Sequence, residues 1–171
     1  MKRKITLFIA TAATVGIALI AAGCGGSASG NSSGPYGPAA PTSPPNAAAG
    51  AAKVAVANSP LGRILVDGPG RTLYLFEKDT GTASTCDGAC ASSWPPFTTT
   101  GNPLAGDGAL AGKLGTTKRT DGKIEVTYNG HPLYYYAGDT KPGDTTGQGL
   151  DSFGAEWDVL SPAGSKIEAG V

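Results

Sequence analysis

The stretch YLFEKD, residues 74–79, returns sixty residues later as YYYAGD, residues 134–139. Both fit the pattern Tyr-x-aromatic-x-x-Asp, with Phe76 and Tyr136 as the middle aromatic residues. A strand presents alternate residues to opposite faces, so Tyr74 and Phe76 should share one face while Leu73 and Leu75 share the other. Because both faces are apolar, we expect each copy to hold a strand that is covered on both sides.

The residues around the two motifs repeat in the same register. At a constant offset of sixty, four apolar or glycine positions coincide: Ile64 with Ile124, Val66 with Val126, Gly70 with Gly130 and Leu73 with Leu133. The two tryptophans, Trp94 and Trp157, follow at an offset of 63. Two hairpin units that cannot each bury a hydrophobic face alone are expected to pair into a common core.

The folded part reads as mostly β. Alternating or β-rich runs predict strands at 53–59, 63–68, 71–77, 123–130 and 131–138, with a last strand and turn within 155–164. Asn129-Gly130, between two such runs, predicts a type I′ hairpin turn. Residues 86–94 have room for one or two helical turns. The sequence thus predicts two related antiparallel hairpin repeats forming one small sheet domain, with a short helical loop.

The motif itself admits two interpretations. In the structural one, the rings of Tyr74 and Tyr134 lie in the core. Asp79 and Asp139 then accept hydrogen bonds from the backbone of the turns that follow directly, at residues 79–81 and 139–140. In the functional one, the tyrosine hydroxyls and the carboxylates face a groove that binds a ligand or supports redox chemistry.

The first 23 residues have the composition of a secretory signal peptide. A basic start at 2–4 precedes an apolar run over 5–22, which ends in small residues. A run of about 18 residues is at the lower limit for a transmembrane helix, and the small residues favour cleavage. Ala21-Ala22-Gly23-Cys24 resembles the bacterial lipobox, although alanine stands where the usual pattern has leucine. We therefore expect lipidation at Cys24 and anchoring to a membrane.

Residues 24–52 contain no charged side chain and are rich in Gly, Pro, Ala and Ser, so we expect a disordered tether. The repeat domain follows over 53–171, with copy one at about 54–100 and copy two at about 113–164. Loss of the leader leaves ten basic residues against 13 acidic ones, a formal charge of −3. A weakly acidic chain has no electrostatic reason to bind nucleic acid.

Cys86 and Cys90 remain as one pair in an exported chain, which favours a disulfide. A thiol redox couple is a second interpretation, although the spacing is not Cys-x-x-Cys and no cation flanks either sulfur in the sequence. A metal site is a third, but zinc or copper needs further soft or imidazole ligands. His131 is the single histidine of the chain, and we expect it on the surface.

The sequence predicts no catalytic residue, cofactor or metal site. It has no G-x-S-x-G, H-E-x-x-H or phosphate-loop motif. Four aspartates lie in a Gly/Thr-rich stretch where calcium could use their oxygens, although turn formation is the commoner role of such residues: Asp139, Asp144, Asp151 and Asp158. A glycosidase-like pair of carboxylates is conceivable, but nothing selects one.

Together these residues resemble the bacterial secreted-repeat lipoprotein family, which carries Tyr-x-(Phe/Trp/Tyr)-x-x-Asp in tandem copies. The matching residues are Tyr74, Phe76, Asp79, Tyr134, Tyr136 and Asp139. The segment CDGACASSWPP, residues 86–96, resembles the loop after the first motif of that family. The resemblance implies an exported, membrane-anchored protein and supplies no reaction.

We therefore expect a non-enzymatic lipoprotein of the cell envelope that binds an envelope protein or a small ligand through its exposed loops. The alternative is a redox or electron-transfer accessory that uses Cys86, Cys90 and the Tyr/Trp residues.

Overall fold

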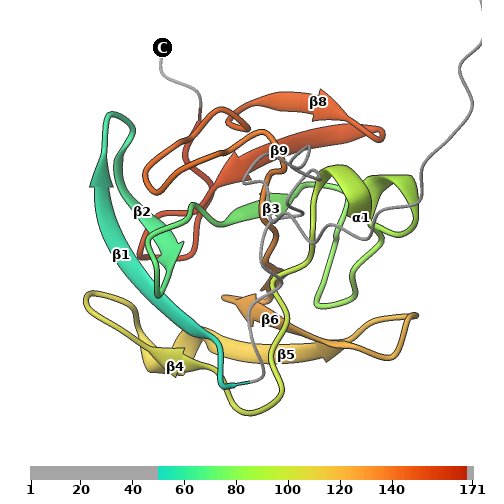
Figure 1. The fold of residues 1–171 in the computed structure, drawn as a ribbon, viewed down its shortest axis with the longest axis horizontal. Coiled ribbons are helices and arrows are strands. Elements are labelled where there is room, and N and C mark those ends of the chain that lie inside the picture. The colour runs from blue at the N-terminus through green and yellow to red at the C-terminus, as the bar shows by residue number, and fades with distance from the viewer. Residues whose placement is uncertain (1–49, 169–171) are drawn as a thin grey trace, which may run out of the picture. The chain divides into compact units, whose positions relative to one another are not determined.

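Three small sheets, linked by isolated bridges, make up the computed structural model, which describes residues 50–168 (Figure 1). All of these residues belong to one unit of the chain, Ala40–Val171. The first sheet has the order β2-β1-β4, the second β3-β9-β8 and the third β5-β6-β7. The strands are β1 (Lys53–Ser59), β2 (Gly62–Asp67), β3 (Tyr74–Phe76), β4 (Leu104–Ala105), β5 (Leu114–Lys118), β6 (Ile124–Tyr128), β7 (His131–Pro132), β8 (Leu150–Ser152) and β9 (Ala155–Val159).

The mostly β fold with two repeats is confirmed, and the pairing is antiparallel except for the two-residue β1–β4 contact. The expected short helix is α1 (Ala89–Ser93), and a 3-10 turn, η1 (Ala111–Lys113), precedes β5. Among the described residues no helix is long and apolar enough to cross a membrane. The predicted signal peptide, Cys24 and most of the predicted tether lie outside the described residues.

The predicted Asn-Gly turn is present between β6 and β7. Asn129 and Gly130 have φ values of 52° and 86°, and Tyr128 pairs with His131 across the turn. A type I′ turn needs positive φ at both central residues, which Asn and Gly tolerate best. The Asn129 side chain also donates to the carbonyl oxygen of Gly164 at 3.1 Å, which ties the turn to the C-terminal segment.

The two motif strands bury both of their faces, as expected. Tyr74 and Phe76 belong to one buried cluster, while Leu73 and Leu75 belong to a second cluster on the opposite face. In the other copy Tyr134 likewise belongs to the first cluster, while its neighbours Leu133 and Tyr135 belong to the second. Alternation along a strand therefore divides the domain into two cores.

The two copies exchange strands. β3 of the first copy pairs with β9 of the second, with Phe76 opposite Trp157 (Figure 1). Correspondingly, residues 133–137 of the second copy bond residues 93–97 of the first, through Phe97 N to Leu133 O at 2.8 Å and Tyr135 N to Pro95 O at 2.8 Å. The sheet β3-β9-β8 is therefore built from both copies.

At the centre of this exchange, Tyr74 and Tyr134 pair with each other. The backbone N–H of each donates to the carbonyl oxygen of the other, at 2.9 and 3.0 Å. The isolated antiparallel bridge between them relates the two motifs by a local two-fold arrangement.

Four aromatic rings stack in a row across the same centre. Phe76 lies on Trp157 with ring centroids 4.0 Å apart, Trp157 lies on Trp94 at 4.0 Å, and Trp94 lies on Tyr136 at 4.4 Å. Each tryptophan therefore packs against the middle aromatic residue of the other copy's motif. The two tryptophans thus occupy equivalent places in the two copies.

The predicted constant offset of sixty between the copies is wrong for the residues that precede the turns at Gly70 and Gly130. Leu73 N bonds Leu65 O, and in the second copy Leu133 N bonds Val126 O. Leu65 therefore corresponds to Val126, at an offset of 61, and both lie in the same buried cluster. The aligned pair Val66 and Val126 lies in different clusters. One additional residue in the first turn causes the shift, because a single-residue slip moves every side chain to the other face.

Several elements differ from the predicted ones. β5 and β8 lie outside every predicted strand, because their glycine, threonine and serine residues give no apolar alternation. Of the strand predicted at 131–138, only the residues of β7 form a strand. Of the strand predicted at 71–77, only those of β3 do. His131 is half-buried on β7, which corrects the expectation of a surface residue.

The loop after the second motif packs tightly against the central rings, which makes Gly147 sensitive to substitution. A Cβ at Gly147 would lie 2.9 Å from Trp94 Cη2 and 3.0 Å from Tyr74 Cζ. Gly147→Ala should therefore lower the free energy of unfolding by about 1–3 kcal/mol through overpacking. Gly81→Ala is the control, since a Cβ there meets nothing within 4 Å. Urea unfolding of the full chain measures both variants, and equal midpoints would contradict this packing.

Candidate functional site

The motif tyrosines and aspartates are joined across the two copies. Tyr74 of the first copy donates its hydroxyl to Asp139 Oδ2 of the second at 2.7 Å. Tyr134 of the second copy donates to Asp79 Oδ2 of the first at 2.5 Å. Each copy of the motif therefore supplies a donor to the other copy and an acceptor in return.

The second oxygen of each aspartate fixes a loop, but at a different place from the predicted one. Asp79 Oδ1 accepts from the backbone N–H and the hydroxyl of Thr85, at 2.8 and 2.7 Å. Asp139 Oδ1 accepts from the same two groups of Thr146, at 3.0 and 2.6 Å. The expectation that each aspartate bonds the residues directly after it is wrong. Asp144 instead accepts from the backbone N–H groups of residues 140 and 141.

These bonds lie mainly in the interior. Tyr74 and Tyr134 are fully buried and Asp79 is 4% exposed, whereas Asp139 is half-buried. Burial, with the carboxylate of Asp139, raises the pKa of Tyr74 far above its usual range. Burial, with the charges of Glu125 and Asp79, does the same to the pKa of Tyr134. Both phenols thus stay protonated and act as donors.

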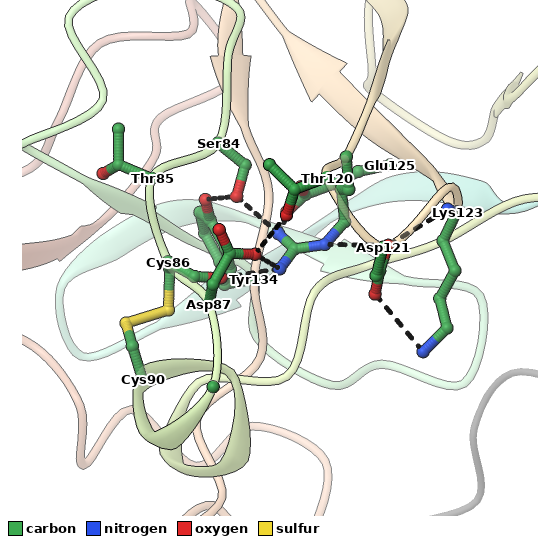
Figure 2. A network of polar contacts seen from close by, with 12 residues as sticks. Ser84, Thr85, Cys86, Asp87, Cys90, Thr120, Asp121, Lys123, Glu125 and Tyr134 are labelled. Carbon is green, nitrogen blue, oxygen red and sulfur yellow. Dashed lines mark hydrogen bonds and ion pairs between the residues drawn. A yellow bond between two sulfur atoms is a disulfide. The ribbon is translucent and has the colours of Figure 1, made fainter.

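A buried ion pair extends the Tyr134–Asp79 side of this arrangement (Figure 2). Arg119, 4% exposed, lies directly after β5, and Glu125, fully buried, lies on β6. Arg119 Nη1 is 2.9 Å from Glu125 Oε2 and also donates to Ser84 Oγ. Ser84 Oγ in turn lies 2.7 Å from the Tyr134 hydroxyl. The pair therefore connects with the motif through one serine.

The same arginine holds the disulfide loop of the first copy. Its Nη2 donates to the carbonyl oxygen of Cys86 at 2.6 Å and lies 3.0 Å from Asp87 Oδ1. Figure 2 shows Asp87 of this loop beside Thr120 of the β5–β6 connection, and Arg119 pairs with both Asp87 and Asp121. One buried cation thus fastens a hairpin of the second copy to a loop of the first.

The predicted disulfide between Cys86 and Cys90 is confirmed, with Cα atoms 5.2 Å apart. Cys86 is fully buried and Cys90 is 7% exposed, and both pack in the aromatic cluster. The bridge closes the loop that leads into α1 (Figure 2). It therefore acts as a local staple beneath the loop surface.

The four aspartates considered for calcium do not come together as one site. Asp139 and Asp144 use oxygens in loop hydrogen bonds, and Asp151 is exposed on β8. Within residues 50–168 the one group of three metal-ligating side chains unites Asp158 with Glu77 and Glu156. There Lys166 Nζ lies 2.6 Å from Glu77 Oε1 and supplies a positive charge.

A family model described as a secreted repeat of unknown function matches the chain twice, over residues 55–98 and 115–161. The chain belongs to this family of secreted repeats. No curated protein and no solved structure matches it.

The two matched segments of this secreted repeat contain both Tyr-x-aromatic-x-x-Asp motifs. The family description agrees with an extracytoplasmic location of the chain. Its two repeats are the two strand-exchanging copies described above, so the family pattern corresponds to the paired core.

Sequence reasoning missed the central polar residues of this secreted repeat. Arg119 and Glu125 lie outside both motifs, and Glu125 sits where apolar Ile64 lies in the first copy. The register that aligns Leu65 with Val126 makes this substitution visible. A charged residue at an inward position of one repeat, where the other repeat has isoleucine, was the available signal.

Removing Asp79 should cost more stability than removing Asp139. Asp79→Ala removes the carboxylate acceptor of the fully buried Tyr134 hydroxyl, whereas water can replace it at exposed Thr85. Loss of the buried acceptor should lower the free energy of unfolding by about 2–3 kcal/mol. Asp139→Ala should cost about 1 kcal/mol, because water reaches that half-buried site. Asp151→Ala, exposed, is the control. Thermal and urea unfolding measure the series, and an equal loss for Asp79 and Asp151 would rule out the buried bond.

The Glu125 carboxyl should make stability depend on pH. Burial raises its pKa from 4.5 to about 7, against the opposing effect of Arg119, and its Oε1 has no hydrogen-bond partner among the described residues. Between about pH 4.5 and 7 the folded chain then holds a proton that the unfolded chain releases. The free energy of unfolding should therefore fall as pH rises through this window, by at most about 3 kcal/mol.

Glu125→Gln isolates this effect, because glutamine keeps an oxygen for Arg119 and does not titrate. The difference in unfolding free energy between wild type and Glu125→Gln should change across pH 4.5–7, whereas exposed Glu156→Gln should track the wild type. A constant difference between Glu125→Gln and wild type would show that folding does not raise the pKa of Glu125.

Proposed function

We propose that this secreted repeat is a lipid-anchored, non-enzymatic module of the cell envelope that binds a partner through its surface. The lipobox-like sequence at 21–24 supports an anchor at Cys24. The following uncharged segment, 24–52, supports a tether that carries the domain away from the membrane surface.

One observation carries the non-enzymatic role: the motif's reactive groups are occupied with each other. Each tyrosine hydroxyl donates to an aspartate of the other copy, and each aspartate also bonds a threonine. Catalytic acids, bases and nucleophiles need access to a substrate, whereas these groups lie in or against the core. The motif therefore serves the fold, and its partners are expected at other positions.

The exposed surface supports a binding or scaffolding role toward an envelope protein or a small ligand. The formal charge of −3 without the leader gives no electrostatic basis for binding nucleic acid. The redox alternative is less well supported. Reactive cysteines are partially exposed, whereas Cys86 and Cys90 are both buried.

The anchor is testable by lipid labelling of cells that express the full chain. Labelled palmitate should be incorporated into the wild-type protein, and the labelled protein should fractionate with membranes. The label should be absent from Cys24→Ala, because that variant lacks the thiol that accepts the lipid. The double variant Cys86→Ala/Cys90→Ala is the matched control and should keep the label. Label retained by Cys24→Ala would show that the chain is not anchored through this cysteine.

A further inference from the structure

A pocket of about 370 Å³ opens beside the start of β1, away from the motif bonds. Six of the side chains that line it matter here: Lys53, Asp67, Pro69, Arg71, Phe97 and Tyr135. The rings of Phe97 and Tyr135 meet edge to face, with centroids 5.4 Å apart, and supply an apolar wall. A volume in this range suits a small ligand. We call this the Arg71 pocket.

Arg71 is held in place above the aromatic wall. Its guanidinium carbon lies 3.9 Å from the centroid of the Tyr135 ring. The Tyr135 hydroxyl donates to Asp67 Oδ2 at 2.8 Å, and the backbone N–H of Arg71 donates to Asp67 Oδ1 at 2.7 Å. Both oxygens of this buried carboxylate are therefore occupied. Stacking leaves the edges of a planar guanidinium group available as donors.

The charges around the Arg71 pocket are unbalanced. Among residues 50–168, neither the Arg71 guanidinium nor the Lys53 ammonium has a carboxylate within 4.0 Å. The stem of Lys53 lies along Gly68, where an added Cβ would sit 3.7 Å from Lys53 Cβ. Two cations and one buried, already bonded carboxylate thus surround an apolar hollow, which favours an anionic ligand.

The equivalent place in the other copy has different chemistry. His131 corresponds to Arg71 and Leu75 to Tyr135, and both line a second pocket of about 380 Å³. Its lysine, Lys166, already pairs with Glu77 at 2.6 Å. The aromatic wall and the two unpaired cations are therefore specific to the Arg71 pocket and do not follow from the duplication itself.

We propose that the Arg71 pocket binds a small organic anion that carries one carboxylate or phosphate group on a compact apolar body. Arg71 and Lys53 hold the anionic group, and the apolar body lies against Pro69 and the exposed edges of Phe97 and Tyr135, whose rings form the buried base of the pocket. This inference deepens the proposed binding role and rests on it. It does not depend on the lipid anchor, which the palmitate experiment tests separately.

Ligand-observed saturation-transfer NMR on the full chain in phosphatidylcholine nanodiscs tests the proposal. Benzoate and phenyl phosphate are the carboxylate and phosphate probes, and benzamide is the uncharged isostere of benzoate. Both anions should bind, and added salt should weaken their binding, because salt screens the attraction between charges. Benzamide should bind at least tenfold more weakly than benzoate. Equal affinity for benzamide, or no binding of either anion up to about 10 mM, would overturn the proposal.

Two variants locate the binding. Arg71→Gln should weaken benzoate binding at least tenfold, and Lys53→Gln, at an exposed position, about threefold or more. Lys118→Gln removes one charge at an exposed position of β5 and should leave the affinity unchanged. Wild-type affinity in both pocket variants, or equal losses in all three, would place the anion elsewhere. Phenyl phosphate recovered intact agrees with the non-enzymatic role, and its hydrolysis would overturn that role while leaving the binding result in place.

Discussion

The structure depends on a reciprocal exchange between two copies of one short motif. Tyr74 and Tyr134 share two backbone hydrogen bonds at the centre, and each hydroxyl reaches the aspartate of the other copy. Buried phenols and carboxylates are costly without partners, so each copy needs the other to satisfy its polar groups. The stacked tryptophans link the two copies through apolar contacts in the same reciprocal way, since each packs on the middle aromatic residue of the other copy's motif. The two copies therefore form one core through contacts that neither makes within itself.

Around this symmetric centre the two copies have diverged in charge. The inward position of Ile64 becomes Glu125, and Arg119 accompanies it within the core. A buried pair of this kind contributes little net stability relative to apolar residues, but losing one partner is expensive. Its geometric effect is specific, because Arg119 bonds the Cys86 carbonyl and thereby sets the disulfide loop against the second copy's hairpin. Arg119 thus adds a second attachment to a loop that Asp79 already holds through Thr85.

The surface has diverged as well, and this is where a binding role finds support. In the Arg71 pocket, Arg71 stacks on Tyr135. The equivalent place in the other copy holds His131 and Leu75. The motif tyrosines and aspartates keep the same bonds in both copies, whereas the positions around the pocket differ, including the buried residues Tyr135 and Leu75. A family of secreted repeats can therefore keep one core while the residues at the pocket positions differ. In both copies the hydroxyls and carboxylates of the motif bond each other, and each carboxylate also bonds a threonine.

The sequence alone determined the mostly β class, the duplication, the Asn129-Gly130 turn, the short helix and the cysteine pair, because each rests on a local period or spacing. It could not decide which tyrosine bonds which aspartate, since both copies carry the same motif and only the chain's path brings Tyr74 to Asp139. It also misplaced the register before the first turn, where one extra residue changes the face of every side chain. The contacts of Arg119 with the disulfide loop and the Arg71 pocket appear only in the tertiary structure, because they join segments far apart in the chain.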